Sequence, residues 1–237
     1  MKTTTSTKKE SQSTLTIIDP SCLMQSGKEL QKSKIKIIYI CDKLIPEQAI
    51  IVIHGPGGVG KTYLAMLLGE AISRGLLCLG LKTKVTVVYY IDHENPEPVL
   101  VERIKKLDIR TMWFWPNSRN PPKIDSDDFD IFKTLPPGLL IIDTLRASQS
   151  FDENNSREMA LIMGKLKELR DIGFTIILLH HSPKGNEKTY KGSTAIFDLS
   201  DHVIGLYQVR KGNKKDEENE DEEKIFRLGT INKTRYE

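Results

Sequence analysis

The residues best suited to chemistry in this sequence form a glycine-rich run that ends in a lysine and a threonine. The run matches the pattern GxxxxGK[ST] at every required position, through Gly55, Pro56, Gly57, Gly58, Val59, Gly60, Lys61 and Thr62. Glycines allow the backbone to wrap a phosphate with its N–H groups pointing inward, and a following helix N-terminus favours the anion. The Lys61 ammonium can reach the β- and γ-phosphates, and the Thr62 hydroxyl can bind Mg²⁺. The run therefore predicts a site for a nucleoside triphosphate with magnesium; a glycine-rich turn that binds no ligand is the alternative.

A carboxylate that can hold the metal follows an apolar run further along the chain. The run Leu-Leu-Ile-Ile, residues 139–142, ends in Asp143. Such a run predicts a buried strand, and it places the Asp143 carboxylate at the carboxyl edge of a sheet, where ligands bind in open α/β folds. Apolar runs that end in Asp are common, so the interpretation depends on the position of this run downstream of the glycine-rich run.

Hydrolysis also requires a group that positions water. Glu94 is the candidate, because it lies just past the predicted strand over residues 85–91 and therefore reaches the same edge of the sheet. Its neighbours Asp92 and His93 are rivals for this role. The alternative is that Glu94 is an ordinary loop carboxylate, or a helix cap before Pro96.

The elements that position these residues alternate between strand and helix. Runs typical of buried strands cover residues 49–54, 85–91, 112–115, 139–143 and 174–180. Helical patterns cover residues 62–74, 99–107 and 157–171. This alternation predicts a parallel sheet with helices on both faces.

Apolar positions within two of these helices predict the faces that they bury. In the helix over residues 62–74, the expected buried stripe is Leu64, Leu67, Leu68 and Ile72, and Gly75 is the expected stop. The helix over residues 157–171 is expected to begin after Asn155 and to bury Met159, Ile162, Met163, Leu166 and Leu169.

The two ends of the chain differ from this pattern. Residues 1–24 are expected to be a flexible tail, and residues 25–237 a single domain that carries the motifs described above. Residues 202–209 and 224–232 are typical of two strands, and the highly charged residues 210–223 between them predict the solvated loop of a hairpin. An acidic tip that binds a partner is the alternative for that loop.

Composition excludes several classes of protein. With 38% hydrophobic residues among 237, a sizeable core is expected and global disorder is not. The 35 Lys and Arg against 32 Asp and Glu give a net charge of only +3, so charge alone does not indicate a polyanionic partner. No apolar run is long enough to cross a membrane, and the first residues lack the apolar core of a secretion signal. A cytoplasmic location without membrane association is expected, with reduced cysteines.

The order of these motifs resembles the RecA-type ATPases, and most closely the branch that contains the hexameric RepA plasmid helicase. The resemblance rests on the glycine-rich run, Glu94, Leu-Leu-Ile-Ile-Asp143, the strand that ends in His180-His181, and the final Lys233-Thr-Arg235. It implies an α/β fold with a RecA-like P-loop NTPase core, a mostly parallel sheet with helices on both faces, and a C-terminal β-hairpin. The implied activity is ATP hydrolysis with Mg²⁺ as cofactor.

The resemblance also implies roles for individual residues. Glu94 is similar to the catalytic base of the family, and Asp143 to the aspartate of its Walker B strand. His181 is similar to its γ-phosphate sensor, since an imidazole can donate a hydrogen bond to that phosphate. The alternative is two histidines at a strand end, of which one is packed and one solvated.

Lys233 and Arg235 are similar to the paired fingers that members of this family insert into the nucleotide site of a neighbouring subunit. This implies a homo-oligomer, expected as a hexameric ring. A solvated basic strand end is the alternative, and Arg210 and Arg227 are weaker rivals for the role of a finger.

The resemblance further implies loops that contact a polynucleotide. Residues 182–194 contain Lys184, Lys188, Tyr190 and Lys191, whose charges can hold phosphates and whose ring can stack on a base. The implied function is a motor or remodelling domain that acts on single-stranded DNA in replication, recombination or repair. A KaiC-like regulatory ATPase with a protein partner, and a nucleotide-binding scaffold subunit that does not hydrolyse ATP, are the alternatives.

Overall fold

The structure, a computed structural model, describes residues 24–182, 193–209 and 225–236, with the backbone alone at 209, 225 and 230–233. The chain divides into two units, Met1–Lys36 and Ile37–Glu237. The expected division into residues 1–24 and 25–237 stays a prediction. In the first unit, the described residues form the short helix α1, Gly27–Gln31, which Ser26 and Glu29 begin with reciprocal side-chain-to-backbone hydrogen bonds.

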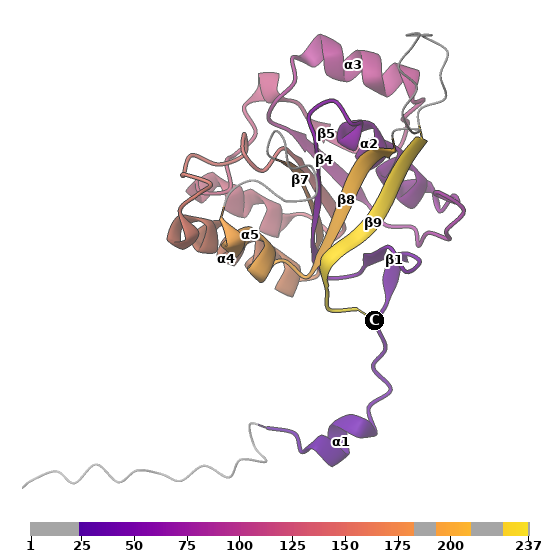
Figure 1. The fold of residues 1–237 in the computed structure, drawn as a ribbon, viewed down its shortest axis with the longest axis vertical. Helices are drawn as coiled ribbons and strands as arrows, with labels where there is room; N and C mark the ends of the chain where they lie inside the picture. Colours follow the sequence, from indigo (N-terminus) through magenta and orange to yellow (C-terminus); the bar gives the residue numbers. More distant parts are fainter. Residues whose placement is uncertain (1–23, 183–192, 210–224, 237) are drawn as a thin grey trace, which may run out of the picture. The chain divides into compact units, whose positions relative to one another are not determined.

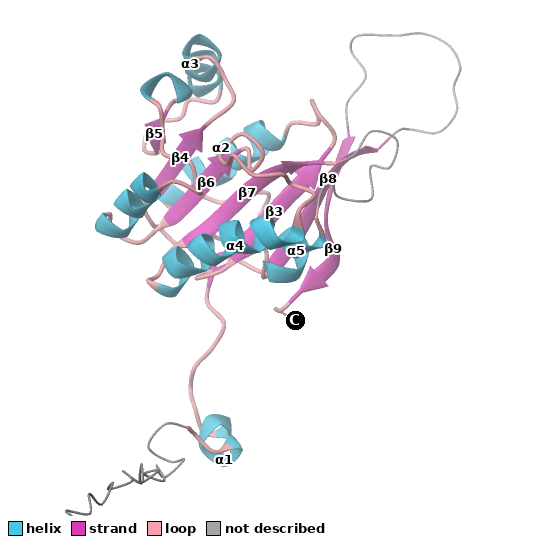
Figure 2. Ribbon diagram, turned by 90° about the vertical axis from the view of Figure 1, so that its left-hand side faces the viewer, coloured by secondary structure: helices cyan, strands magenta, loops and turns pink. Residues whose placement is uncertain are grey.

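The second unit is built on a seven-stranded sheet, whose β8 and β9 lie side by side in Figure 1. The strand order is β5-β4-β6-β7-β3-β8-β9 (Figure 2). All neighbours are parallel except β8 and β9, which form the predicted antiparallel pair. The strands are β3 (Ile50–Gly55), β4 (Val88–Asp92), β5 (Trp113–Trp115), β6 (Leu139–Asp143), β7 (Thr175–His181), β8 (His202–Val209) and β9 (Ile225–Thr234). A separate two-stranded sheet joins β1 (Tyr39–Cys41) to β2 (Ile45–Pro46).

Helices cover both faces of the large sheet, as the alternation of elements predicts. Alternate residues of each buried strand point to opposite sides, so that Ile51 and Ile53 pack with one cluster while Ile50 and Val52 pack with the other. The first cluster includes α2 (Lys61–Arg74) and α3 (Glu97–Lys106). The second includes α4 (Ser156–Asp171), α5 (Thr194–Leu199) and the 3₁₀ segment η3 (Asp127–Thr134). In Figure 2, α4 and α5 lie in front of the sheet.

Two details of the packing differ from the sequence prediction. In α2, Leu68 and Ile72 are buried as predicted, but Ala65 and Met66 are buried as well, whereas Leu67 is 47% exposed, so the buried face is rotated relative to the predicted stripe. The buried face of α2 contains the small residues Ala65 and Gly69, which contribute little to a hydrophobic pattern in the sequence. The strand predicted from residue 85 begins at Val88, because pairing with Leu139 begins there and Val85 is exposed.

The other helix prediction is confirmed. Asn155 begins α4, since its side chain accepts hydrogen bonds from the backbone N–H groups of Arg157 and Glu158. All five predicted apolar positions of α4 are buried. Residues 210–223, predicted as a hairpin loop, lie outside the described residues. Among the helices that the structure describes, none combines the length and the apolar character needed to cross a bilayer.

Candidate active site

The glycine-rich run connects β3 to α2, as its predicted chemistry requires. Gly58 and Gly60 have positive φ angles of 76° and 96°, a backbone region that residues with a side chain rarely adopt. Gly60 directly precedes the first residue of α2 and offers no side-chain cap. The first backbone N–H groups of α2 are therefore left for an anion.

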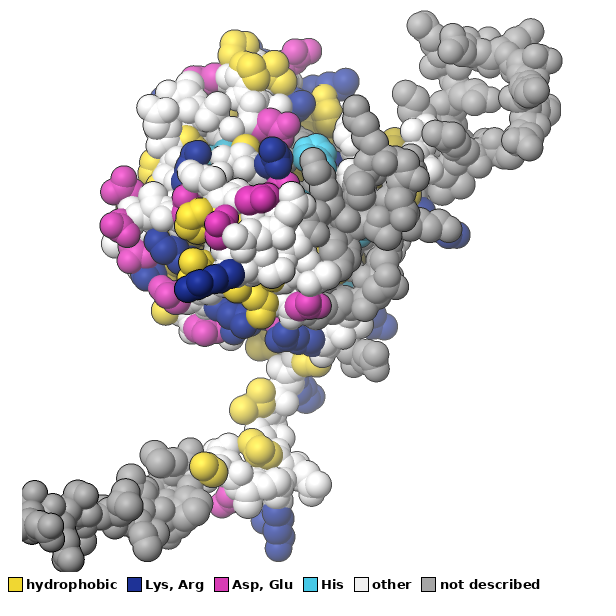
Figure 3. Space-filling view, turned by 60° about the vertical axis from the view of Figure 1, so that its left-hand side comes forward, with side chains coloured by type: hydrophobic (Ala, Val, Ile, Leu, Met, Phe, Trp, Pro, Cys, Tyr) yellow, Lys and Arg dark blue, Asp and Glu magenta, His cyan; other side chains and the backbone are white. Residues whose placement is uncertain are grey.

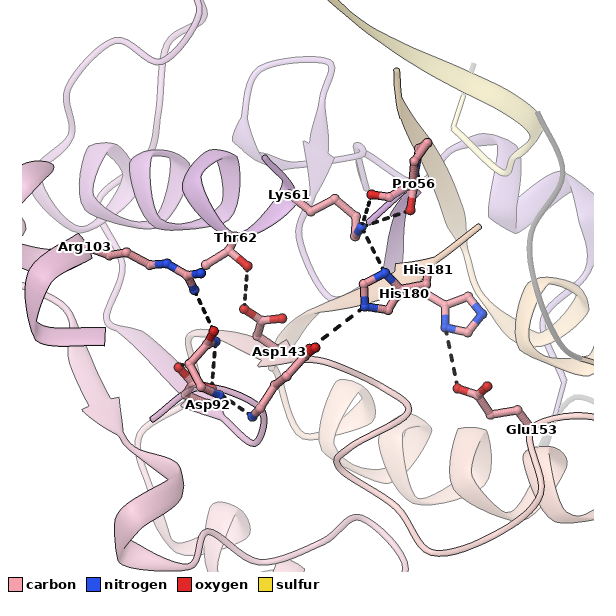
Figure 4. A network of polar contacts seen from close by, with 12 residues as sticks. Pro56, Lys61, Thr62, Asp92, Arg103, Asp143, Glu153, His180 and His181 are labelled. Atoms are coloured by element: carbon pink, nitrogen blue, oxygen red, sulfur yellow. Dashed lines mark hydrogen bonds and ion pairs between the residues drawn. The ribbon is translucent and has the colours of Figure 1, made fainter. Parts of the chain in front are cut away.

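Lys61 is the first residue of α2, and backbone oxygens at the start of the glycine-rich run hold its ammonium. Its Nζ donates to the carbonyl oxygens of Gly55 at 2.9 Å and Pro56 at 2.8 Å, and lies 3.4 Å from His181 Nδ1 (Figure 4). The side chain is buried, which lowers the pKa of Lys61, while the charges of Asp143 and Glu94 oppose this shift. These hydrogen bonds hold the lysine ammonium against the start of the glycine-rich run.

The two predicted metal ligands meet at the carboxyl edge of the sheet. Thr62 Oγ1 donates a hydrogen bond of 2.8 Å to Asp143 Oδ2 (Figure 4). Burial raises the pKa of Asp143, although hydrogen bonds from Tyr90 and Thr62 favour its ionised form. A hydroxyl and a carboxylate are hard oxygen ligands of the kind that Mg²⁺ prefers, and Mg²⁺ commonly takes its remaining ligands from substrate phosphates and water. These two residues therefore fit a magnesium ion that accompanies a nucleotide.

Tyr90 is a partner of Asp143 that the sequence did not indicate. It lies within β4, fully buried, and its hydroxyl donates a hydrogen bond of 2.6 Å to the same Oδ2 that accepts from Thr62. Burial is the main cause that raises the pKa of Tyr90 well above its ordinary value, so the hydroxyl remains a donor. Within its apolar run an aromatic residue indicates only core packing, and the contact depends on the register of β4 with β6.

Replacing Tyr90 by Phe is expected to lower the free energy of unfolding by about 1.5–3 kcal/mol, because the buried carboxylate of Asp143 loses a charge-assisted hydrogen bond. Urea denaturation of the purified variant measures this. Tyr89→Phe is the matched control, since the neighbouring Tyr89 hydroxyl donates to a neutral acceptor near the surface, the carbonyl oxygen of Pro136. Equal stability of the Tyr90 variant and the wild type would contradict the importance of this hydrogen bond.

Glu94 and His181 face each other across the cavity that these residues enclose. Strand register brings them together, since Asp92 pairs with Asp143 and Gly55 pairs with His181 at the same edge of the sheet. Glu94 Oε2 lies 3.9 Å from His181 Nε2, and both side chains are partly exposed. The cavity measures about 190 Å³ and is lined by Gly58, Gly60, Lys61, Thr62, Tyr63, Glu94, Asn95, Arg103, Asp143, Thr144 and His181.

The rivals of Glu94 do not line this cavity. The Asp92 carboxylate is buried and accepts hydrogen bonds from its own loop. The His93 backbone N–H donates to the carbonyl oxygen of Asp143, and burial lowers the pKa of the His93 imidazole to about 4. Among the three candidates, Glu94 alone lines the cavity.

The two histidines at the end of β7 diverge. His181 points toward Lys61, whereas His180 is buried on the opposite side, with its Nδ1 4.0 Å from Glu153 Oε1 (Figure 4). The geometry is thus that of one packed and one partly exposed histidine, and it places the exposed one at the phosphate loop.

Tyr63 of α2 and Arg103 of α3 form one wall of the cavity. No sequence motif indicated this wall. The Arg103 guanidinium lies 5.7 Å from the centroid of the Tyr63 ring, a cation–π distance, and its Nη1 donates to Asn95 Oδ1 at 2.9 Å. Tyr63 directly follows Thr62, which is the only sequence signal for its position. Arg103 is brought here by the packing of α3.

His54 lies behind the phosphate loop in a buried environment. Its Nδ1 is 3.2 Å from Ser182 Oγ and its Nε2 is 3.5 Å from the Tyr207 hydroxyl. Burial, with smaller contributions from the charges of His180 and Lys61, lowers the pKa of His54 to about 4.

Acidification is therefore expected to destabilise the fold between pH 6.5 and 4, because the unfolded chain takes up a proton at His54 that the native state refuses. From this histidine alone the loss at pH 5 is on the order of 2 kcal/mol. Urea midpoints at pH 7 and pH 5 measure it. A His54→Gln variant should lose less stability on acidification than the wild type, and an equal loss in both proteins would contradict the assignment.

The expected fingers lie away from the cavity of their own chain. β9 runs antiparallel to β8 and pairs Thr234 with His202, so Lys233 and Arg235 reach the amino edge of the sheet. Arg235 Nη1 donates to Asp201 Oδ1 at 2.8 Å, and its side chain is half-exposed. The side chain of Lys233 lies outside the described residues, as do Lys184, Lys188, Tyr190 and Lys191 of the predicted nucleic-acid loop.

The fold and the phosphate loop together define a RecA-like P-loop nucleotide-binding protein. The family model described as AAA domain matches residues 19–187, well over half of the chain, and the chain belongs to this family. The sheet with its flanking helices is similar to that of two archaeal proteins of known structure. The flagellar accessory protein FlaH from Methanocaldococcus jannaschii matches with a TM-score of 0.51 and 14% identity, over 81% of this chain and 84% of its own. The KaiC-like protein PH0186 from Pyrococcus horikoshii OT3 matches with a TM-score of 0.56 and 16% identity, over 84% of this chain and 86% of its own.

Proposed function

We propose that this protein binds ATP together with Mg²⁺ and hydrolyses it at a site that a neighbouring subunit completes. The observation that carries the proposal is the meeting of Glu94 and His181 at 3.9 Å within the cavity that holds Lys61 and the Thr62–Asp143 pair. The cavity thus contains a carboxylate that can accept a proton from water and an imidazole that can donate a hydrogen bond to a phosphate. It also contains a lysine that can contact phosphates and two oxygen ligands for a metal ion. Phosphoryl transfer requires little beyond such positioning and charge stabilisation.

In this mechanism, Glu94 accepts a proton from the attacking water through a carboxylate oxygen. The water oxygen forms a bond to the γ-phosphorus, the bond from that phosphorus to the bridging oxygen breaks, and ADP leaves with the electron pair. Lys61 exchanges its carbonyl partners for phosphate oxygens, and His181 donates a hydrogen bond to the γ-phosphate. Magnesium, when bound, neutralises the charge that develops on the phosphates.

The base end of the nucleotide is proposed to lie against Tyr63 and Arg103. A tyrosine ring and a planar guanidinium both stack on a flat aromatic base, and these two form the cavity wall that is not occupied by the phosphate-binding groups. We assign adenine to this wall from the resemblance to ATPases.

Lys233 and Arg235 are proposed to act on the nucleotide of an adjacent subunit, which requires a homo-oligomer, expected as a RepA-like hexameric ring. The position of Arg235 supports this role, because it is half-exposed at the amino edge of the sheet and distant from the cavity of its own chain. Its present partner Asp201 retains Arg170 at 3.2 Å and the Ile50 N–H at 2.9 Å when Arg235 engages elsewhere.

Two outputs of ATP hydrolysis are proposed. Sequence features of residues 182–194 favour movement on single-stranded DNA, in replication, recombination or repair and in the cytoplasm. Similarity to the KaiC-like protein over most of both chains favours a regulatory ATPase with a protein partner. On the face drawn in Figure 3, acidic and basic side chains of the described residues are interspersed, so this face does not favour DNA over protein.

The rate of ATP hydrolysis with and without single-stranded DNA separates these outputs. Strong stimulation by DNA would support the motor and would contradict the regulatory ATPase. A rate that does not respond to DNA, together with a protein partner that accelerates it, would support the regulatory ATPase. Intact ATP after long incubation of assembled protein would support the scaffold subunit and contradict hydrolysis.

A further inference from the structure

Asp92 is a buried carboxylate at the end of β4 that the proposed mechanism does not use. It has no exposed surface, and its Oδ1 accepts hydrogen bonds from the backbone N–H groups of Glu94 at 2.9 Å and Asn95 at 2.8 Å. The Asn95 amide Nδ2 donates to both carboxylate oxygens at 3.1 Å. All of these donors belong to the loop that carries Glu94 into the cavity.

Asn95 extends this set of contacts to the other end of the cavity. Its side-chain oxygen accepts the hydrogen bond from Arg103 Nη1 at 2.9 Å, and Arg103 in turn lies over the Tyr63 ring. One amide therefore receives Arg103 on its oxygen side and holds Asp92 on its nitrogen side. Asp92 and Asn95 therefore connect the Glu94 backbone to the Arg103 side chain. In the proposed function, Glu94 lies next to the γ-phosphate and Arg103 next to the base.

The energetics of burial make this arrangement restrictive. A carboxylate without exposed surface must be satisfied by donors, and among the described residues those of Asp92 come from the loop itself rather than from a Lys or Arg side chain. Any movement of the loop that displaced Glu94 would break several charge-assisted hydrogen bonds at once. The buried charge therefore selects one loop conformation from the several that an ordinary surface loop samples.

We infer that Asp92 is a positioning residue, which fixes the Glu94 backbone for the attack of water and, through Asn95, fixes Arg103 for binding of the nucleotide. The inference rests on the proposed function for the roles of Glu94 and Arg103. Asp92 itself touches neither the substrate nor the attacking water.

Asp92 acts through two sets of contacts: the Glu94 arm, its hydrogen bonds with the backbone N–H groups of Glu94 and Asn95, and the Arg103 arm, its contact through the Asn95 side chain with Arg103. Three variants separate these two arms in steady-state ATP hydrolysis. Asp92→Ala removes both arms, so kcat is expected to fall about 100-fold and KM for ATP to rise, since small misplacements of catalytic groups cost about this much. Asp92→Asn keeps an oxygen that can accept from the Glu94 and Asn95 N–H groups, so kcat is expected to recover most of the loss. Its amide then faces the Asn95 amide, donor against donor, and KM stays raised. Asn95→Ala releases Arg103, so its main effect is expected on KM.

This pattern differs from that of a residue that only stabilises the fold. A structural role would lower kcat in proportion to the fraction of unfolded protein, and it would leave KM unchanged in the folded remainder. Asp125→Ala is the matched control, because the Asp125 carboxylate also accepts a backbone N–H, from Ser150, in a loop outside the cavity. Its kcat and KM are expected to equal those of the wild type.

Wild-type kcat and KM in Asp92→Ala would overturn the inference, as would equal losses in Asp92→Asn and Asp92→Ala that follow their thermal stability. If Glu94→Gln retained full turnover, the proposed function would fail instead. If the wild type bound ATP without hydrolysing it, the affinity for a fluorescent ATP analogue would still test the Arg103 arm. Asp92→Ala and Asn95→Ala should then weaken binding to a similar extent, and unchanged affinity in both would overturn the inference.

Discussion

Replacing Glu94 by Gln is expected to lower kcat for ATP hydrolysis at least about 100-fold and to leave ATP binding nearly unchanged. General-base catalysis contributes about 10²–10⁴-fold, and an amide of the same shape cannot accept the proton of the attacking water. Gln has the same shape as Glu, and the Glu94 side chain is partly exposed at the cavity edge, 3.9 Å from His181, so the replacement is expected to leave the fold unchanged. Phosphate release and the affinity for a fluorescent ATP analogue measure the two quantities.

Glu102→Gln is the control for this experiment. Glu102 is exposed on α3, close in sequence to the cavity residue Arg103, but it does not line the cavity. Its variant should hydrolyse ATP at the wild-type rate. Undiminished hydrolysis by the Glu94 variant would remove Glu94 from the mechanism, and loss of ATP binding in the same variant would show that the cavity itself had changed.

Replacing Arg235 by Ala is expected to lower hydrolysis about 10³-fold or more, because arginine fingers contribute about 10³–10⁵ to kcat. The effect on folding should be small, since Arg235 is half-exposed and its partner Asp201 keeps the hydrogen bonds from Arg170 and the Ile50 N–H. Lys233→Ala is expected to act in the same direction. Arg227→Ala, on the same strand β9 and exposed, tests the rival for the finger role, and it should retain activity if Arg235 is the finger.

A mixture of two inactive variants tests whether the finger acts in trans. Glu94→Gln subunits retain Arg235, and Arg235→Ala subunits retain Glu94, so an interface between them can contain both groups. In a random equimolar assembly with head-to-tail interfaces, about a quarter of the sites should regain activity. Persistent inactivity of an assembled mixture would contradict a shared site, as would full activity of Arg235→Ala alone.

The elements that bury continuous apolar runs could be predicted from the sequence. The bounds of β6 are those predicted, because a continuous aliphatic run is typical of a strand of a parallel sheet that is covered on both faces. The bounds of β8, which pairs with β3 and β9, are also those predicted. The phosphate loop could also be predicted, because the backbone shape of the site requires its glycines and the charge of the phosphates requires its lysine.

Contacts that depend on strand register or helix rotation could not be predicted in this way. Tyr90 meets Asp143 only because β4 and β6 pair as neighbours although they are distant in the chain. Arg103 enters the cavity only because α3 packs with that side toward α2. The buried face of α2 was misjudged because Ala65 and Gly69 signal little hydrophobicity, whereas the exposed Leu67 signals much. The short helix α5 and the segment η3 were missed altogether.

The rate of phosphate release per subunit, measured against protein concentration with ATP and Mg²⁺, tests the central claim most directly. A site composed of Glu94 from one subunit and Arg235 from the next predicts hydrolysis that requires Mg²⁺ and rises per subunit as the protein assembles. A rate per subunit that is constant across concentrations while the protein assembles would contradict the shared site. Phosphate release no greater than that of a Lys61→Ala variant, at any concentration, would contradict hydrolysis itself.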